Sequence, residues 1–588
     1  MRFIVVADSH IRFPDDDVAT YPSNAFMADR NRRVVELCNR IGPAFVIHLG
    51  DIVHPLPVES DHEPAVQLAA DVYSTLDAPI HFVAGNHDIG DKPNALVAVP
   101  AVADENYPVF EEYWGPPFGS FDVNDCHFVI VDTPVLNSGL PREAAQEDWL
   151  ESDLATARAR GQRIFVFTHY PPFVHDAAED EHYDNLGEPA RGWLLDALAR
   201  YEVEAVFSGH VHNFLYNHHE GTDLYVVPAT GFVRPDYSEL AAIAPETEGG
   251  RDDPAKLGIF VVDVTDEGHT IKPVRTFGAV DVGAPTPSLV DAVVRPGWSS
   301  PIGVTLRHGW MSDVDFPTAG LDEFRRKTIR NDALLPALWE ARITDVRIPI
   351  GDIASLMGRD RLGHLHGRGM NFTIRSAGVP DARTVARVAA AQSAITRWEI
   401  VVPPYDFEAT LVALAAAPPG LPLAIAPLVP LGPPENAVHH FVTSGFDSTA
   451  DPTLDGLLEA DATGLIGEIV FRLAPDQPIG PAFAAAADVA AAAGRGAIVN
   501  VELPRAGENI HFDDDEAVAD RVEEAARAAL EHPDVAVLLD GFADHDRSYY
   551  PRHGLIDRRF NPRPALHRLI AIASASTAGT GSGAQQTI

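Results

Sequence analysis

Five stretches of the first 212 residues share one pattern, an apolar run followed at once by polar side chains: Phe3–His10 (FIVVADSH), Phe45–Asp51 (FVIHLGD), His81–Asp88 (HFVAGNHD), Ile164–His169 (IFVFTH) and Ala205–His212 (AVFSGHVH). Short apolar runs bounded by turn residues are typical of buried strands in an α/β domain. Loops that follow the carboxyl ends of such strands converge on one crevice. We therefore expect these polar residues to meet, although they are spread over 200 positions.

The converging side chains form a metal-ligand set of two Asp, one Asn and four His. Mixed oxygen and imidazole ligands suit borderline ions such as Mn, Fe, Co or Zn. The sequence predicts two divalent ions, with Asp51 bridging them. The ligands of one ion would be Asp8, His10 and His212, and those of the other Asn86, His169 and His210. Any one motif is more often an ordinary polar strand end, but five in this order argue for a site.

The rest of the chain divides into further α/β segments. Strand and helix patterns alternate through residues 1–280, and a Pro/Gly/Ser-rich stretch at 281–300 is typical of a linker. Residues 301–572 contain eight or nine βα units, one helix being expected at 321–341. This favours a (β/α)₈ TIM-like barrel, with an open doubly wound sheet as the alternative. The Ser/Thr/Gly-rich tail, 573–588, is predicted to be disordered.

Composition limits the partners. The 588 residues carry a formal charge of −41, which argues against nucleic-acid polymers and anionic membranes as partners. No apolar run is long enough to span a bilayer. The chain enters a strand directly from Met1, without a charged leader, and Cys38 and Cys126 are too few to staple it. These features predict a cytoplasmic protein with buried free thiols.

The motifs D-x-H, G-D, G-N-H-[DE], H and G-H-x-H together resemble the calcineurin-like metallophosphoesterase superfamily over roughly residues 1–280. The resemblance implies an αββα sandwich and two divalent ions (Mn²⁺, Fe²⁺/Fe³⁺, Zn²⁺ or Co²⁺). It implies the same ligands: Asp8, His10, Asp51 and His212 at one ion, and Asp51, Asn86, His169 and His210 at the other. It further implies that Asn86, His87 and His210 contact substrate, and that His87 helps the leaving oxygen to depart.

Differences from the motifs of other branches narrow the part of the superfamily that this chain resembles. Phosphoprotein phosphatases have an Asp-Arg pair after G-D, and purple acid phosphatases have a Tyr where this chain has His54. A D-x-H near the start and His169 followed by Tyr-Pro-Pro resemble the cyclic-nucleotide phosphodiesterase and glycerophosphodiesterase branch. We expect hydrolysis of a small organic phosphodiester through a metal-bridging hydroxide, with Asp51 and His87 as the catalytic residues. A phosphomonoesterase is the alternative, and a homo-oligomer is possible.

The second half places polar residues where barrel strands would end, which is the functional rim of such barrels. They are Arg307, His308, Asp352, Arg375, Asp406, Asp447, Arg472, Glu502, Arg505 and Asp540. The segment 540–565 weakly resembles the end of glycosidase-like barrels. Glycoside hydrolysis needs two facing carboxyl groups, and Glu502 with Asp406 or Asp540 are candidates. A sugar- or phosphosugar-binding module and a structural role are the alternatives.

Overall fold

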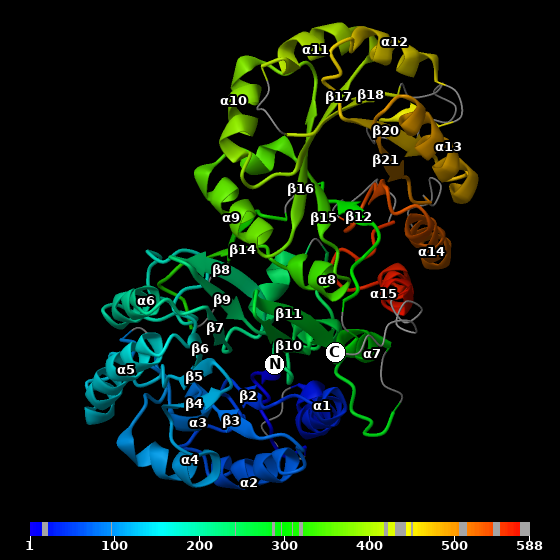
Figure 1. The fold of residues 1–588 in the computed structure, drawn as a ribbon. Coiled ribbons are helices and arrows are strands. Elements are labelled where there is room, and N and C mark those ends of the chain that lie inside the picture. Colours follow the sequence, from blue (N-terminus) through cyan, green and yellow to red (C-terminus); the bar gives the residue numbers. More distant parts are fainter. Residues whose placement is uncertain are drawn as a thin grey trace, which may run out of the picture. The chain divides into compact units, whose positions relative to one another are not determined.

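The computed structural model divides the chain into two compact units, each described by itself (Figure 1). Unit 1 comprises Met1–Val294 and Ser312–Pro336, and unit 2 comprises Arg295–Met311 and Ala337–Ile588. The structure describes all residues except 15–20, 96, 242, 285–287, 296, 308–309, 317–320, 417–420, 430–442, 449–450, 505–513, 545–552 and 577–588. No helix in the part of the chain that is described is long and apolar enough to cross a membrane.

Unit 1 is built on two mixed sheets. The first has the order β11 (Gly268–Arg275), β10 (Gly258–Thr265), β1 (Arg2–Val6), β2 (Val46–His48) and β3 (Ile80–Phe82). The second has the order β4 (Gly119–Val123), β5 (Cys126–Ile130), β6 (Arg163–Thr168), β7 (Ala205–Ser208), β9 (Thr222–Val226) and β8 (Leu215–His219). Strands β1, β2 and β3 are parallel, as are β5, β6 and β7.

The two sheets pack face to face through aromatic rings. Phe3 of β1 lies 5.6–6.1 Å from the ring centroids of four phenylalanines of the second sheet: Phe128, Phe165, Phe167 and Phe207. The next residue along β1, Ile4, points the other way and packs with α1 (Met27–Ile41), because successive side chains of a strand alternate between its faces.

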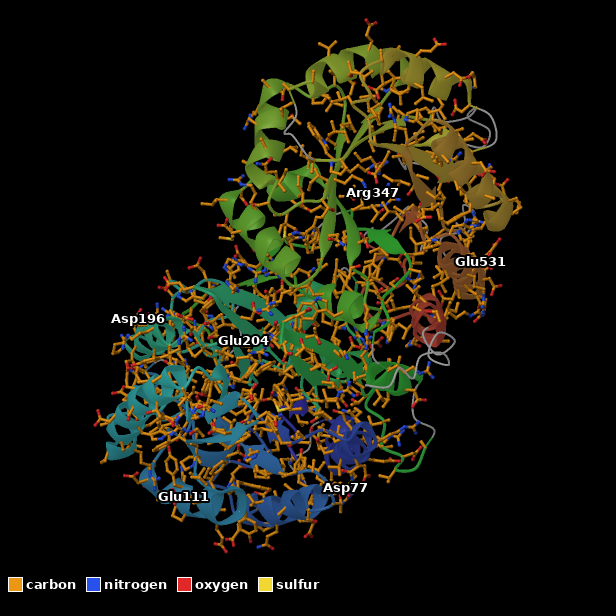
Figure 2. All side chains as sticks on the ribbon, in the orientation of Figure 1. Asp77, Glu111, Asp196, Glu204, Arg347 and Glu531 are labelled. Carbon is orange, nitrogen blue, oxygen red and sulfur yellow. The ribbon has the colours of Figure 1, made fainter. Side chains whose placement is uncertain are left out.

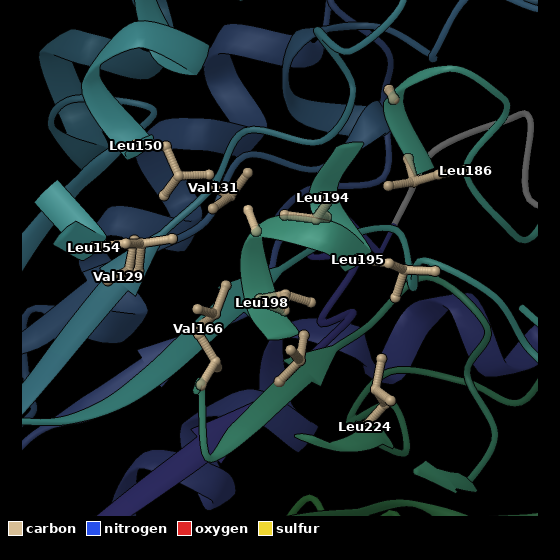
Figure 3. Packing of buried hydrophobic residues seen from close by; sticks show 14 of the residues in the cluster. Val129, Val131, Leu150, Leu154, Val166, Leu186, Leu194, Leu195, Leu198 and Leu224 are labelled. Carbon is tan, nitrogen blue, oxygen red and sulfur yellow. The ribbon is translucent and has the colours of Figure 1, made fainter. Parts of the chain in front are cut away.

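The outer face of the second sheet is covered by α5 (Pro141–Ala159) and α6 (Ala190–Arg200). Leu150 of α5 and Leu194 of α6 pack on Val129 and Val166 in one fully buried cluster (Figure 3). With α1 on the outer face of the first sheet, the layer order is helix, sheet, sheet, helix. The expected αββα sandwich is confirmed.

Unit 1 also includes Ser312–Pro336, which follow the expected linker and which we call the strap. Its strands β13 (Asp313–Asp315) and β14 (Thr328–Arg330) pair antiparallel. The expected helix over 321–341 is wrong, since only α8 (Leu335–Glu340) forms there. Helix propensity is a weak prior that tertiary contacts override. Here the buried Lys327 and Arg330 bond to Asp184 and to the Tyr216 carbonyl of unit 1, which holds the chain extended.

Unit 2 is a closed ring of eight parallel strands. They are β12 (Gly303–Thr305), β15 (Asp345–Pro349), β16 (Asn371–Ala377), β17 (Arg397–Val402), β18 (Leu423–Pro427), β20 (Glu468–Leu473), β21 (Gly496–Val501) and β22 (Val535–Leu539). Pairing of β18 with β20 and of β22 with β12 closes the ring, so the (β/α)₈ barrel is confirmed. A two-residue strand, β19 (Phe446–Asp447), pairs parallel with β20 at Phe471–Arg472, beyond the residues of β20 that pair with β18.

Helices surround the ring of strands (Figure 1). They are α9 (Leu356–Gly367), α10 (Ala382–Ala391), α11 (Phe407–Leu414), α12 (Pro452–Ala460), α13 (Ile479–Ala492), α14 (Asp515–Glu531) and α15 (Pro564–Ser576). Figure 2 shows Arg347 among the strands and Glu531 on the outer helix α14. Of the expected disordered tail, residues 577–588 lie outside the described residues, as do His308 and Arg505 of the expected rim.

Candidate dimetal centre

The candidate ligands lie in the loops that follow five parallel strands of unit 1. Asp8 and His10 follow β1, Asp51 follows β2, and Asn86 begins the short helix α3 (Asn86–Ile89) after β3. The second sheet contributes His169 after β6, and His210 and His212 after β7. All seven side chains are buried. The site therefore lies where the carboxyl ends of both sheets meet.

One group of donors comprises Asp8, His10, Asp51 and His212, whose ligand atoms all lie within 4.8 Å of one another. The Nε2 atoms of His10 and His212 are 3.0 Å apart. His10 Nε2 lies 3.5 Å from Asp51 Oδ2, and His212 Nε2 lies 3.4 Å from Asp8 Oδ1. These four side chains surround one point.

A second group shares Asp51 with the first. Its other members are His169 and His210, again within 4.8 Å, and Asn86 joins them through its amide oxygen. Asn86 Oδ1 lies 2.9 Å from His169 Nε2 and 3.0 Å from His210 Nδ1, while His169 Nε2 lies 3.3 Å from Asp51 Oδ1. Each oxygen of Asp51 thus faces a different group, which is the geometry of a bridging carboxylate.

The backbone is strained at most of these positions. Asp8, His10, Asp51, His210 and His212 all have φ between 44° and 67°, a left-handed region that few residues other than glycine occupy. Non-glycine residues in this region cost free energy and cluster at functional sites. The tight turns that end β1, β2 and β7 are therefore held in place by the surrounding fold.

Glycines allow two of the loops to touch. A side chain on Gly85 would place its Cβ 2.1 Å from the Asp51 amide nitrogen. Gly50 has a φ of +94°, and a Cβ there would lie 2.7 Å from His169 Nδ1. Because neither position can accept a larger residue, the G-D and G-N-H motifs each need their glycine.

Hydrogen bonds fix which imidazole nitrogen faces the donors. His169 Nδ1 bonds to the Leu49 carbonyl at 2.8 Å, and His212 Nδ1 bonds to the Phe232 carbonyl at 2.9 Å. With Nδ1 donating to a carbonyl, each ring turns Nε2 toward the other donors, the orientation that metal-ligating histidines have. Asp88, by contrast, accepts from the Ile52 and Gly85 amides at 3.0 and 2.9 Å, so it braces the two loops.

In the absence of ions the carboxylates and imidazoles compensate one another. Burial opposes ionisation of Asp51, but the facing His169 and His87 imidazoles outweigh it and hold the pKa of that carboxyl well below its usual range. Burial also opposes protonation of His169, but the facing Asp51 carboxylate raises the pKa of His169 to about 9, so an ion at this position would displace a proton from that ring. Burial lowers the pKa of His10 and of His210. Anionic carboxylates and neutral imidazoles are the forms that bind metals. Oxygen and nitrogen donors that face one another at 2.9–3.5 Å can be bridged by a cation between them. The donors fit two divalent ions of the Mn, Fe, Co or Zn type.

His87 and His54 stack beside the first group. Their ring centroids are 5.3 Å apart, and His87 lies 4.7 Å from the His10 ring. His87 Nδ1 bonds to the His54 carbonyl, and the His87 amide donates to Asp51 Oδ1 at 2.8 Å. The structure thus places His87 at the edge of the site, with Nε2 as the ring atom not used by these bonds.

Sequence reasoning missed a buried ionic cluster behind His210. Asp184 Oδ1 lies 3.8 Å from His210 Nε2, and Asp184 also bonds to Arg234, Tyr237 and Lys327. Lys327 belongs to the strap, and its ammonium lies 2.6 Å from Asp184 Oδ2. None of these residues is in a recognisable motif, but Lys327 is one of only four lysines in the chain, and that rarity was an available signal.

The chain matches a known protein family, curated relatives and solved structures. Residues 1–214 match the calcineurin-like phosphoesterase family. The serine/threonine-protein phosphatase CPPED1 of Danio rerio is 31% identical over 225 residues, covering 37% of this chain and 70% of the relative. The protein of the same name from Rattus norvegicus is 30% identical over 207 residues, covering 34% and 64%. A solved dimetal phosphatase of Danio rerio matches 47% of this chain and 96% of its own at 13% identity, with a TM-score of 0.35.

Proposed function

Because this chain belongs to the calcineurin-like phosphoesterase family, we propose that it is a metal-dependent hydrolase of small organic phosphodiesters. The observation that carries the proposal is the convergence of seven buried oxygen and nitrogen donors into two groups that share Asp51. Divalent ions at such a centre lower the pKa of a coordinated water and neutralise charge on a transferring phosphoryl group.

The chain's own residues have distinct roles in this proposal. Asp8, His10, Asp51 and His212 hold one ion, and Asp51, Asn86, His169 and His210 hold the other. Asn86, His87 and His210 line the position of the phosphoryl group. His87, fixed through Nδ1 on the His54 carbonyl, carries a proton at Nε2 to the leaving oxygen, the usual work of a positioned imidazole.

A phosphodiester is favoured over a monoester by the charge around the centre. A diester carries one negative charge, whereas a monoester carries nearly two at neutral pH. The cations of the cluster behind His210 are already engaged by carboxylates, Arg234 by Asp184 and Asp236, and Lys327 by the same two residues. Phosphomonoester hydrolysis is the second candidate, since the curated relatives are named as phosphatases.

The test compares Asp51→Asn and Asn86→Ala with the exposed control Asp77→Asn. We expect both site variants to hydrolyse bis-p-nitrophenyl phosphate at least about 1000-fold more slowly in Mn²⁺, because each removes an ion ligand. The control should keep full activity. Undiminished activity in both site variants would refute the proposal. Faster turnover of p-nitrophenyl phosphate than of the diester would replace it by the monoesterase.

We also place the enzyme in the cytoplasm, acting on small molecules and not on nucleic-acid polymers or membranes. The formal charge of −41 supports the choice of partners. Both cysteines, Cys38 and Cys126, are buried and free, which supports a reducing compartment. Cell fractionation with an antibody against the chain would test the location, and light scattering would test for a homo-oligomer.

A further inference from the structure

The mouth of the barrel in unit 2 gathers arginines in a chain that is otherwise strongly acidic. Arg307 follows β12, Arg375 is in β16, and Arg472 is in β20, each near the carboxyl end of its strand. Their side chains are 25%, 21% and 29% exposed. In barrels this end carries the ligand sites, so these guanidinium groups are placed where a ligand would arrive.

Each arginine is held by a carboxylate that is itself buried. Arg472 Nε and Nη2 lie 2.8 and 3.2 Å from the two oxygens of Glu502. Arg375 Nε lies 3.1 Å from Glu399 Oε1. Arg307 donates to the Asp540 carbonyl at 2.7 Å and lies 3.4 Å from its carboxylate. Among the described contacts, Arg472 donates through its Nε–Nη2 edge to Glu502 and Arg375 donates through Nη2 to Ser444, so each of these two keeps N–H donors for a second acceptor.

Backbone packing brings two of these arginines to one place. Arg375 Nη2 bonds to Ser444 Oγ, and a Cβ on the next residue, Gly445, would lie 3.0 Å from Arg472 Cβ. Gly445 has a φ of +118°, a conformation that favours glycine. The segment Ser444–Gly445 therefore links the Arg375 and Arg472 sides of the mouth.

Among the described residues, four arginines of this cluster form ion pairs with three carboxylates. Below the mouth, Arg347 is 1% exposed and lies 3.1 Å from Glu399, which also serves Arg375. Four guanidinium groups thus share three carboxylates, those of Glu399, Glu502 and Asp540. Burial, together with the nearby Arg347, lowers the pKa of Arg375 to about 10. An anion at the mouth would relieve this crowding of like charges.

The same contacts argue against a glycosidase at this position. Glycoside hydrolysis needs one carboxylic acid that gives up a proton and a second carboxylate facing it. Glu502 uses both oxygens on Arg472, and Asp540 accepts from the Leu503 amide at 3.1 Å and pairs with Arg307. Both carboxylates are therefore paired with arginines rather than facing each other across a substrate position.

We propose that the barrel mouth binds a small organic anion, whose phosphate or carboxylate group lies against Arg375 and Arg472. The site is separate from the dimetal centre and does not depend on the proposed phosphodiesterase activity. Rigid arginines with a free edge recognise planar or tetrahedral oxyanions through paired N–H donors.

Titration calorimetry on the full chain carrying Asp51→Asn, treated with chelator, isolates this site from the dimetal centre. The probes are inorganic phosphate, glucose 6-phosphate, glucuronate and uncharged glucose. We expect glucose 6-phosphate or glucuronate to bind, and glucose not to bind. Adding Arg375→Met or Arg472→Met should weaken binding at least about tenfold, the loss expected for a charged hydrogen-bonded contact.

Arg527→Met is the matched control, since this arginine is 62% exposed on the outer helix α14, and binding should be unchanged. Arg472→Lys, which keeps the charge, covers the case in which Arg472→Met fails to fold, and should bind with intermediate affinity. Failure of all three charged probes to bind, equal binding of glucose, or full affinity in the arginine variants would overturn the proposal. Hydrolysis of chromogenic glycosides that Glu502→Gln abolishes would also overturn it.

Discussion

The dimetal centre and the barrel mouth occupy equivalent places, the carboxyl ends of parallel strands, yet they handle charge in opposite ways. In the centre, the ion pairs of Asp8 and Asp51 among the described residues are with histidines. In the mouth, Glu399 and Glu502 are paired with arginines. One site compensates its carboxylates with cations from outside the chain, and the other does so from within. The first is therefore built to hold metal, and the second has cationic edges left for an anion.

The largest effect should come from removing metal. We expect chelation to abolish phosphodiester hydrolysis, by about 1000-fold or more, because the ion pairs of Asp8 and Asp51 among the described residues are with histidines and not with lysine or arginine. Mn²⁺ or Zn²⁺ should restore it. Anion binding by the barrel should survive the same treatment, as measured by calorimetry. If chelation removed both the hydrolysis and the anion binding, the two sites would not be independent.

The next effect concerns the stability of the barrel. Glu399 is fully buried beside Arg347 and Arg375, so Glu399→Gln would leave the buried Arg347 and the partly exposed Arg375 short of a partner. Removing one member of a buried ion pair costs about 3–5 kcal/mol. We expect a lower midpoint of thermal unfolding for this variant, while the exposed Glu531→Gln serves as a control with no shift. An unchanged midpoint would show that the barrel does not depend on the ion pairs of Glu399 with Arg347 and Arg375.

A pair of carboxylates should respond to pH in opposite directions. Burial opposes it, but hydrogen bonds from His269 and Arg163 hold the pKa of Glu204 (Figure 2) at about 2, below 4.5. Its stabilisation is therefore present above pH 4.5 and is lost as the pH falls toward 2. Burial raises the pKa of Asp352 in the barrel to about 6 from 3.8, so its contribution is present below pH 3.8 and is lost as the pH rises through 6.

At pH 7 we expect Glu204→Gln to destabilise and Asp352→Asn to stabilise the protein, each by about 2 kcal/mol. Near pH 2 both differences should vanish. Denaturant unfolding at the two pH values measures them. The same sign for both variants at pH 7 would contradict the assignment.

The smallest effect is expected at the strap. Lys327→Met removes the buried cation from Asp184, which faces His210 Nε2, and loss of such outer contacts typically weakens metal binding about 10- to 100-fold. We expect a decrease near tenfold in Mn²⁺ affinity by calorimetry. Lys272→Met, which removes a partner of Asp263 at the far end of the sheet, should leave the affinity unchanged. Equal Mn²⁺ affinities for the two variants would show that Lys327 of the strap has no effect on metal binding.

The candidate metal ligands of unit 1 could be predicted because each follows its strand within a few residues. Short stretches of sequence are therefore enough to identify them. The barrel could be predicted from the βα alternation. The strap could not, since Lys327 and Arg330 act through contacts made more than 100 residues away. Likewise, Arg375 was predicted at the rim of the barrel, but its partner Glu399 was not, because their pairing depends on which strands become neighbours in the closed ring.

The route of the chain has a consequence for how these two units are inherited. The polypeptide passes from unit 1 to unit 2 after Val294, returns at Ser312, and leaves again after Pro336. A recombination event that copied only the family-matched stretch, 1–214, or a gene fragment ending at 300, would leave Lys327 behind. Unit 1 is therefore complete only in a gene fragment that extends through residue 336.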